Sequence, residues 1–325
     1  MTEPERDQTS AEQPFIHEPV MLAEVLDAFA PIPSGVVVDA TVGGGGHARA
    51  ILQAHTDVTL VGLDRDDDAL AAAAETLADF GDRVTLRRSS FDRIAAELDA
   101  LGVDAIAAFL FDLGVSSPQL DRARRGFSYR ANGPLDMRMD RRETLSAHVV
   151  VNDYDERSLA EVLRRYGDER FASRIARAIV SARPVTTTVE LSEIVRHAIP
   201  AATRRTGGHP ATRTFQAIRI EVNRELEVLP RALDDAIDLL EPQGRGAVLS
   251  YHSGEDRVVK GVFANAATGG CICPPRLPCQ CGARARVKLL WRGGHTAGAD
   301  ELARNARAKS ARLRAVERLP VVGAA

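Results

Sequence analysis

The sequence predicts an α/β protein with a parallel, doubly wound sheet and an inserted helical segment. Short apolar runs alternate with Ala- and Leu-rich helical runs over residues 36–112, and this alternation is typical of βαβ units. Three of the apolar runs end in an aspartate, namely Asp39, Asp64 and Asp112. Residues 144–205 then carry only helical signals before a strand signal returns, so the chain leaves the sheet and comes back to it.

The strands of the first half are short runs rich in Val, Leu, Ile and Phe, as in a sheet that is buried on both faces. The expected elements are a helix over 20–30, a strand over 36–39, a helix from 47, a strand over 58–64, a helix over 67–80, a strand over 83–87, a helix over 92–101 and a strand over 105–112. Because the carboxyl ends of parallel strands share one edge, the three aspartates should meet where such folds bind ligands.

The second half is expected to be helical over 155–166 and 169–182, with a strand resuming over 244–252. Between them, residues 212–240 place apolar side chains at every third or fourth position, which predicts one buried helix face that Pro230 should kink or restart. The predicted organisation is a disordered tail (1–14), the first part of a ligand-binding α/β domain (15–140), an inserted helical substrate-binding domain (141–208) and the second part of the α/β domain with a basic C-terminal tail (209–325).

Composition excludes several classes of protein. No run approaches the ~20 apolar residues of a membrane span, and the polar N-terminus predicts no secretory signal, so we expect a cytoplasmic protein without a membrane partner. The net charge of −3 is unevenly distributed, because residues 284–319 carry ten Lys and Arg against three acids. This basic tail is either a phosphate-binding surface or a solvated amphipathic helix.

A glycine-rich loop, Asp39-Ala-Thr-Val-Gly-Gly-Gly-Gly-His47, follows the first strand. Glycines allow a sharp turn and a close approach of the backbone to a ligand. Asp64 lies 18 residues after Gly46, near the offset expected for a carboxylate that binds a ribose hydroxyl. NAD and S-adenosylmethionine both carry that ribose, but Asp39 before the loop favours the methyl donor, whose amino group is cationic.

The turn that follows Asp112 indicates the chemistry. An exocyclic amine is a weak nucleophile, and hydrogen-bond acceptors that hold its two hydrogens direct its lone pair at a methyl donor. The Asp112 carboxylate and the Ser116-Ser117-Pro118 turn supply such acceptors. Taken alone this pattern is also a common structural turn, so the glycine loop and the turn together carry the prediction of methyl transfer to an amine.

The order of motifs resembles the RsmH (MraW) family of ribosomal RNA small subunit methyltransferases over about residues 15–318. The matching blocks are His17-Glu-Pro-Val-Met21, Asp39 to His47, Asp64-Arg-Asp66, Asp112 to Asp121, Arg125-Gly-Phe-Ser128, Gly133 to Asp140, His209 to Gln216, Tyr251-His-Ser-Gly-Glu-Asp-Arg257 and Asn305 to Arg314. The family usually has Phe and Leu where this chain has Tyr251 and Gly254. The first change is mild, and the second puts packing at a helix start in doubt.

The resemblance implies a Rossmann-like class I fold that transfers a methyl group from S-adenosyl-L-methionine to the 4-amino group of one cytidine in the decoding region of 16S rRNA. Its partner would be 16S rRNA within the small ribosomal subunit, and a homodimer is left open. The implied catalytic residues are Asp112, Ser116, Ser117 and Pro118. The implied cofactor-binding residues are Gly45, Gly46, His47, Asp64, Phe91, Asp112 and Gln119.

Other residues carry weaker expectations. Residues 133–140 are interpreted as a substrate-side loop, with a solvated charged loop as the alternative. His209 is expected to be structural and His252 to face the substrate. Cys271-Ile-Cys273 and Cys279-Gln-Cys281 could bind zinc, but these arms are tighter than the usual knuckle, so a proline-stiffened loop without metal is favoured.

Two other functions use the same residues. An NAD-dependent oxidoreductase could share the glycine loop, but the Asp112 turn and the lack of an evident acid–base pair for hydride transfer argue against it. A non-catalytic ribosome assembly factor could keep the fold, but the retained strand-end acids argue for activity.

Overall fold

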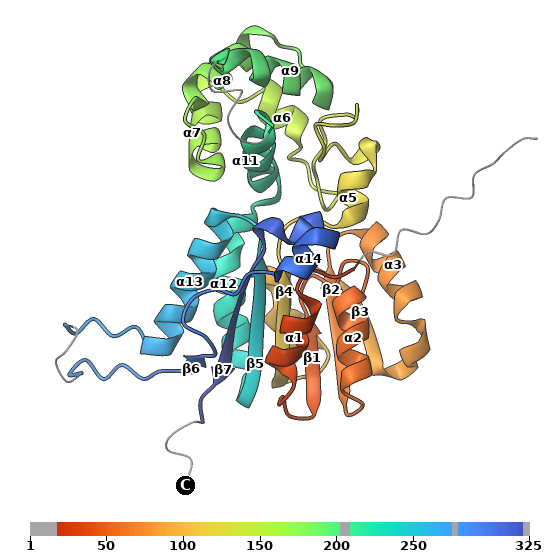
Figure 1. Ribbon diagram of the computed structural model, residues 1–325, viewed down its shortest axis with the longest axis vertical. Coiled ribbons are helices and arrows are strands. Elements are labelled where there is room, and N and C mark those ends of the chain that lie inside the picture. The colour runs from red at the N-terminus through yellow and green to blue at the C-terminus, as the bar shows by residue number, and fades with distance from the viewer. Residues whose placement is uncertain (1–17, 202–208, 275–278, 321–325) are drawn as a thin grey trace, which may run out of the picture.

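A computed structural model describes residues 18–201, 209–274 and 279–320 of the chain (Figure 1). The predicted disordered tail, residues 1–14, lies outside this part. The described strands form one sheet in the order β3-β2-β1-β4-β5-β7-β6. They are β1 (Gly35–Asp39), β2 (Val58–Asp64), β3 (Val84–Arg88), β4 (Ile106–Asp112), β5 (Leu240–Ser250), β6 (Val287–Leu289) and β7 (Arg312–Arg318).

The first five strands pair in parallel, and β7 runs antiparallel to both of its neighbours. From β1 the chain moves outward through β2 and β3, then crosses back to place β4 on the other side of β1. The doubly wound fold predicted from the sequence is therefore confirmed, with β1 and β4 flanking its switch point. The antiparallel edge was not predicted.

Helices cover both faces of this sheet because its strands are apolar on both sides. One core contains residues of α1 (Leu22–Phe29), α2 (Gly46–Ala54) and α3 (Asp67–Thr76), and the other contains residues of α4 (Ile94–Ala100), α12 (Glu225–Leu239) and α13 (Ser253–Thr268). Along β4 the side chains alternate between these cores: Ala108 and Leu110 belong to the first, Phe109 and Phe111 to the second.

The remaining long helices form a separate unit above the carboxyl edge of the sheet (Figure 1). We call this unit the helical module; its members are α6 (Ala147–Asn152), α7 (Glu156–Gly167), α8 (Ala172–Ser181), α9 (Thr188–Ala198) and α11 (Thr212–Asn223). They share one core with Leu135, Met137 and Met139 of the predicted substrate-side loop. A solvated charged loop is therefore the wrong interpretation of that segment.

The junction between α11 and α12 corrects one prediction. The helical stripe does break, but at Arg224, whose φ of 52° is left-handed, while Pro230 lies inside α12 without ending it. Preceding Arg224, the Asn223 side chain donates to the Met137 carbonyl and accepts the Met139 amide. These bonds hold the substrate-side loop at the point where the chain passes from the helical module to the sheet.

The predicted basic tail is also corrected, because most of it is built into the fold. After α14 (Ala299–Arg304), the chain forms a short 3-10 helix (Ala306–Ser310) and then β7, which pairs with β5 and β6. Arg314 lies 2.7 Å from Asp256, and Arg304 lies 3.0 Å from Glu18. A truncation there would remove a strand from the sheet, so it cannot test RNA binding alone. In the described part of the chain, no helix is long and apolar enough to cross a membrane.

Candidate active site

A cavity of about 890 Å³ opens at the carboxyl edge of the sheet, at the switch point between β1 and β4. Its walls come largely from the loop after β1 (residues 40–46) and the segment after β4 (residues 112–120). Asp64, Phe91 and Tyr251 are among the other residues that line it. A cavity of this size suits a cofactor or substrate of several hundred daltons.

The glycine loop turns β1 into α2 and leaves one wall of the cavity bare. Gly43 and Gly45 have φ values of +53° and +82°, which side chains rarely adopt. A Cβ atom on Gly46 would come within 2.7 Å of Pro19 Cγ, whereas one on Gly44 would meet no atom within 4 Å. The first amides of α2 lack helical partners, so they can donate to a ligand in the cavity.

Three aspartates gather under this loop, as their strand-end positions predict. Asp39 is only 2% exposed, and its burial, opposed by the Thr41 amide and reinforced by the charges of Asp112 and Asp64, raises its pKa to about 8. Burial likewise raises the pKa of Asp64, whose two carboxylate oxygens accept the Gly43 and Asp66 amides at 3.0 and 2.9 Å. Asp39 supports the loop from beneath and is not among the cavity-lining residues, whereas Asp64 and Asp112 are.

Asp112 is held by hydrogen bonds from two other strand ends. The Tyr251 hydroxyl donates to Asp112 Oδ1 at 2.6 Å, and the Asp112 amide donates to Thr41 Oγ1 at 2.6 Å. Burial, together with the Asp112 charge and hydrogen bond, raises the pKa of Tyr251 well above its usual value, so its hydroxyl stays protonated and remains a donor. The substitution that sequence analysis considered mild therefore adds a bond to the predicted catalytic carboxylate.

His47 sits at the start of α2, with its buried side chain between the loop and Asp112. Its Nε2 donates to the Val20 carbonyl at 3.0 Å, since a carbonyl can only accept, and its Nδ1 lies 3.6 Å from Asp112 Oδ2. The side chain thereby ties the segment before α1 to the cavity. A cofactor contact through its backbone amide remains compatible with this arrangement.

The Ser-Ser-Pro turn opens α5 (Ser117–Asp121). Ser116 lines the cavity, and its hydroxyl is buried without a hydrogen-bond partner among the described residues. The side chains of Ser117 and Pro118 lie outside the described part of the structure. Gln119 is 4% exposed and spans the turn, because its Oε1 accepts the Ser116 amide at 3.0 Å and its Nε2 donates to Asp66 at 2.8 Å.

Behind Gln119 lies a buried ion pair that sequence analysis missed. Arg125 and Asp66 are 2% and 4% exposed, with 2.7 Å between the guanidinium Nη2 and the carboxylate Oδ2. Burial opposes ionisation of Asp66, but hydrogen bonds from Arg125 and Gln119 hold its pKa below the ordinary range. Arg125 also donates to the Met139 carbonyl at 3.2 Å. Both residues lie in segments that match the family, Asp64-Arg-Asp66 and Arg125-Gly-Phe-Ser128, and this match is the feature of the sequence that could have indicated the pair.

The remaining predicted residues divide between the cavity and the scaffold. Phe91 lines the cavity and packs edge-on against Phe111 at 5.7 Å between ring centres. His252, which was expected to face the substrate, caps a helix: its Nδ1 accepts amides at the start of α13, and its ring lies against Glu255. It is not among the residues that line the cavity. His209 accepts the Ala211 amide and stacks on Tyr129 at 4.3 Å.

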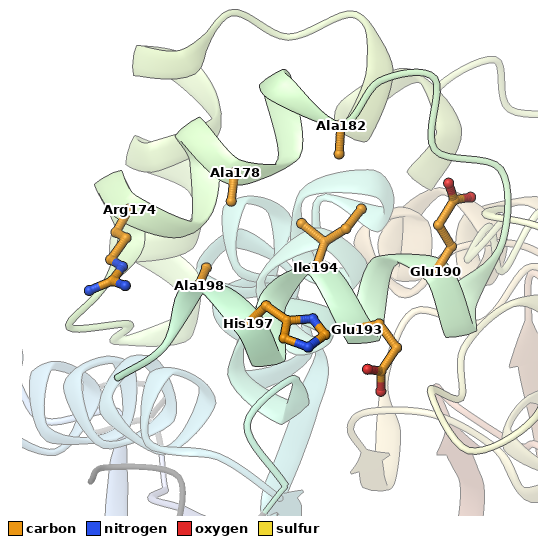
Figure 2. Close-up of a pocket in the computed structure, with 8 residues that line it drawn as sticks. All are labelled: Arg174, Ala178, Ala182, Glu190, Glu193, Ile194, His197 and Ala198. Atoms are coloured by element: carbon orange, nitrogen blue, oxygen red, sulfur yellow. The ribbon is translucent and has the colours of Figure 1, made fainter. Parts of the chain in front are cut away.

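A second cavity of about 580 Å³ lies in the helical module, between α8 and α9 (Figure 2). Arg174 and Ala178 face it from α8, and Glu190, Ile194 and His197 face it from α9. It contains neither a glycine turn nor a strand end. The cavity at the sheet edge is therefore the candidate active site.

The sequence profile of the MraW methylase family matches residues 14–319. This chain belongs to that family. It is 52% identical over 310 residues to "Ribosomal RNA small subunit methyltransferase H" of Symbiobacterium thermophilum, an alignment that covers 94% of this chain and 97% of the relative. The relative of the same name from Thermobifida fusca is 51% identical over 309 residues, which is 93% of each chain.

Membership of a methylase family confirms the resemblance and decides against an NAD-dependent oxidoreductase. The methyl donor is S-adenosyl-L-methionine. The cavity fits this cofactor on three observations: the glycine loop leaves a bare wall, Asp64 and Asp112 offer carboxylates to a cationic molecule, and the buried Ser116 hydroxyl has no partner within the described residues.

Proposed function

We propose that this protein methylates the exocyclic 4-amino group of a specific cytidine in the decoding region of 16S rRNA, in the cytoplasm. The observation that carries the proposal is the convergence of two groups on one cavity beside the glycine loop. They are Asp112 and the Ser116 hydroxyl, which has no hydrogen-bond partner in the part of the chain that the structure describes. The relatives named ribosomal RNA small subunit methyltransferase H support the substrate class.

Residues that follow the first three strands would hold the cofactor. The amides of Gly46 and His47 can donate to its carboxylate, because they lie at the start of α2. Gly45, whose own amide donates to the Val42 carbonyl at 2.8 Å, would contribute through the left-handed turn that brings the backbone close to the cofactor. Each Asp64 oxygen accepts one backbone amide and keeps lone-pair capacity for a ribose hydroxyl. Phe91 offers its ring to the adenine. Bound there, S-adenosyl-L-methionine supplies an electrophilic methyl group on a sulfonium.

The residues after β4 would orient the amine. The Asp112 carboxylate and the Ser116 oxygen can each accept one amine hydrogen, which directs the nitrogen lone pair away from them and into the cavity. The amine gives up its proton only as the new bond forms, and the Asp112 carboxylate or solvent water can take it. Asp112 can therefore act as an ionised carboxylate without being a strong base. Gln119 belongs to this group as a positioning residue, because both ends of its amide are bonded within the protein.

The helical module is proposed to bind the RNA. It stands over the carboxyl edge of the sheet (Figure 1). Met139, which belongs to the core of the module, and Leu120, which packs against that core, also line the cavity. A base that enters between the module and the sheet would meet the cavity that Asp112 and the glycine loop line. Ser117 and Pro118 are retained in the proposal as members of the turn.

The product of the reaction tests this proposal. Small subunits that lack the modification are incubated with the protein and S-adenosyl-L-methionine, and the nucleosides of the digested 16S rRNA are analysed by mass spectrometry. We expect N(4)-methylcytidine at one position in the decoding region. Finding 5-methylcytidine, or a cysteine-linked RNA adduct, would show that the amine mechanism is wrong, because methylation at the ring carbon needs a covalent nucleophile.

A further inference from the structure

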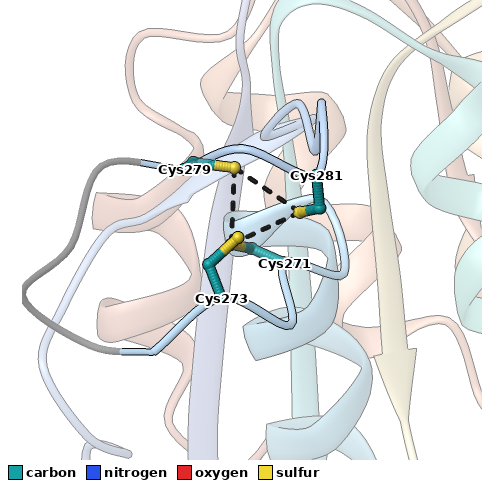
Figure 3. Close-up of side chains that lie close together, drawn as sticks. All are labelled: Cys271, Cys273, Cys279 and Cys281. Atoms are coloured by element: carbon teal, nitrogen blue, oxygen red, sulfur yellow. Dashed lines mark hydrogen bonds between the residues drawn. The ribbon is translucent and has the colours of Figure 1, made fainter.

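Four cysteine sulfurs meet in the segment between α13 and β6 (Figure 3). The Sγ atoms of Cys271, Cys273, Cys279 and Cys281 all lie within 4.8 Å of one another. Cys279 is 3.5 Å from Cys271 and 3.5 Å from Cys281, and Cys281 is 3.7 Å from Cys271. The two C-x-C arms thus face each other, and their short spacing does not keep the sulfurs apart.

These distances fit a tetrahedral metal better than disulfides. Zinc binds thiolates at about 2.3 Å, which places sulfurs at the corners of a tetrahedron about 3.8 Å apart. A disulfide joins two sulfurs at about 2.05 Å and does not bring the other two sulfurs close to them. Here the sulfur of Cys279 is equidistant from two others, and all four cysteines are free.

Backbone amides are directed at the sulfurs, as expected for a site that holds thiolates. The Gln280 amide donates to Cys273 Sγ at 3.4 Å. The amides of Ile272 and Ala283 are directed at Cys281, and the amide of Cys273 is directed at Cys271. Such hydrogen bonds orient metal-bound thiolates and stabilise their negative charge.

Apolar burial does not explain why this segment converges. Ile272, the one large apolar side chain described between the first and last cysteine, is 88% exposed. The base of the loop is nevertheless closed, because the Arg286 amide donates to the Ala266 carbonyl at 2.8 Å and a Cβ on Gly269 would come within 2.2 Å of the Arg284 carbonyl oxygen. A short loop without its own core is commonly held by a metal or a disulfide.

We propose that Cys271, Cys273, Cys279 and Cys281 bind one zinc ion as a structural site. Four thiolates fill the tetrahedral coordination and leave no position for a substrate, which distinguishes structural from catalytic zinc. The site lies at the end of α13 distant from Tyr251, and the 16 residues of that helix span roughly 24 Å. The ion would tie the end of α13 to β6 and would take no part in methyl transfer. This replaces the expectation of a metal-free loop.

Metal analysis of the full-length protein tests the proposal. We expect one zinc per chain after purification under reducing conditions, and its loss when all four cysteines are changed to serine. The matched control changes Ile272 and Gln280, the middle residues of the two arms, to serine and should keep the zinc. Less than a stoichiometric amount in the wild-type protein, even after zinc is added back, would overturn the site.

Cobalt(II) substitution provides a second measurement, which does not require that a variant lacking the cysteines folds. Exchange into the wild-type protein should give the intense visible absorption of tetrahedral cobalt with sulfur-to-metal charge transfer, and the control variant should reproduce it. Octahedral cobalt absorption, or disulfides in the protein isolated with thiols blocked, would refute the four-thiolate site. If the fourfold variant fails to fold, the single variant Cys279→Ser replaces it in the test and should bind the metal at least tenfold more weakly than the wild-type protein.

Discussion

The candidate active site and the cysteine loop are built in opposite ways. The cavity draws residues from the ends of β1, β2, β4 and β5. From Ala40 to Tyr251 its parts span more than two hundred positions of the chain, and they meet only because the sheet forms. The cysteine loop collects its four sulfurs from eleven consecutive positions. The first site is held by buried hydrogen bonds and ion pairs, and the second by a proposed metal. Substitutions in the two sites should therefore have different effects on stability and activity.

The largest expected effect comes from breaking the buried pair behind the catalytic turn. Arg125→Ala leaves the buried Asp66 carboxylate without its cationic partner, so the free energy of unfolding should fall by roughly 3–5 kcal/mol, as measured by chemical denaturation. Arg124→Ala is the matched control, because Arg124 is 64% exposed and lies 3.8 Å from Asp68. The control should lose less than about 1 kcal/mol. Equal losses would mean that burial does not set the strength of the network.

The second expected difference is that catalysis depends on the candidate active site and not on the cysteine loop. Asp112→Ala should lower kcat by about 100-fold or more, because the amine loses an acceptor that is already oriented. The variant with all four cysteines changed to serine should keep most of its activity when assayed below its own melting temperature. Initial rates of methyl incorporation into RNA give the comparison. If the cysteine variant lost as much as Asp112→Ala, the two sites would not be independent.

Cofactor affinity depends on the end of β2. Asp64→Ala should weaken S-adenosyl-L-methionine binding by roughly 1.5–3 kcal/mol, the scale of a hydrogen bond to a charged group, as measured by calorimetry. Asp67→Ala is the control, since Asp67 is 74% exposed and only three residues away. Unchanged affinity in Asp64→Ala would remove the ribose assignment and leave the fold prediction intact.

The smallest expected effect tests whether the Tyr251 hydroxyl contributes to catalysis. Tyr251→Phe removes the hydroxyl that donates to Asp112 and restores the residue usual in the family, so kcat should fall by roughly tenfold or less. The KM for the methyl donor should change less than kcat, because the Asp112 carboxylate, which the cofactor can also contact, is still present in this variant. Tyr154→Phe removes a similar bond, to Glu221 at 2.8 Å in the helical module, and should leave kcat unchanged.

Local patterns in the sequence predict five of the strands, β1 to β5, but not β6 and β7. They also show that three strands end in aspartate and that a glycine loop follows β1 and a Ser-Pro turn follows β4. These features follow from local composition and from the rule that parallel strands end at one edge. The match of β2 to its predicted bounds, Val58–Asp64, shows how strong such a signal is.

The pairing of residues that are distant in the chain becomes visible once the chain is folded. The fold placed the basic C-terminal segment in the sheet as β7, moved the helix break from Pro230 to Arg224, and joined Arg125 to Asp66 and Tyr251 to Asp112. Each depends on a contact between residues far apart in the chain, which no local pattern encodes. The four sulfurs are the reverse case: their spacing was visible in the sequence, but only backbone geometry showed that two tight arms could face each other.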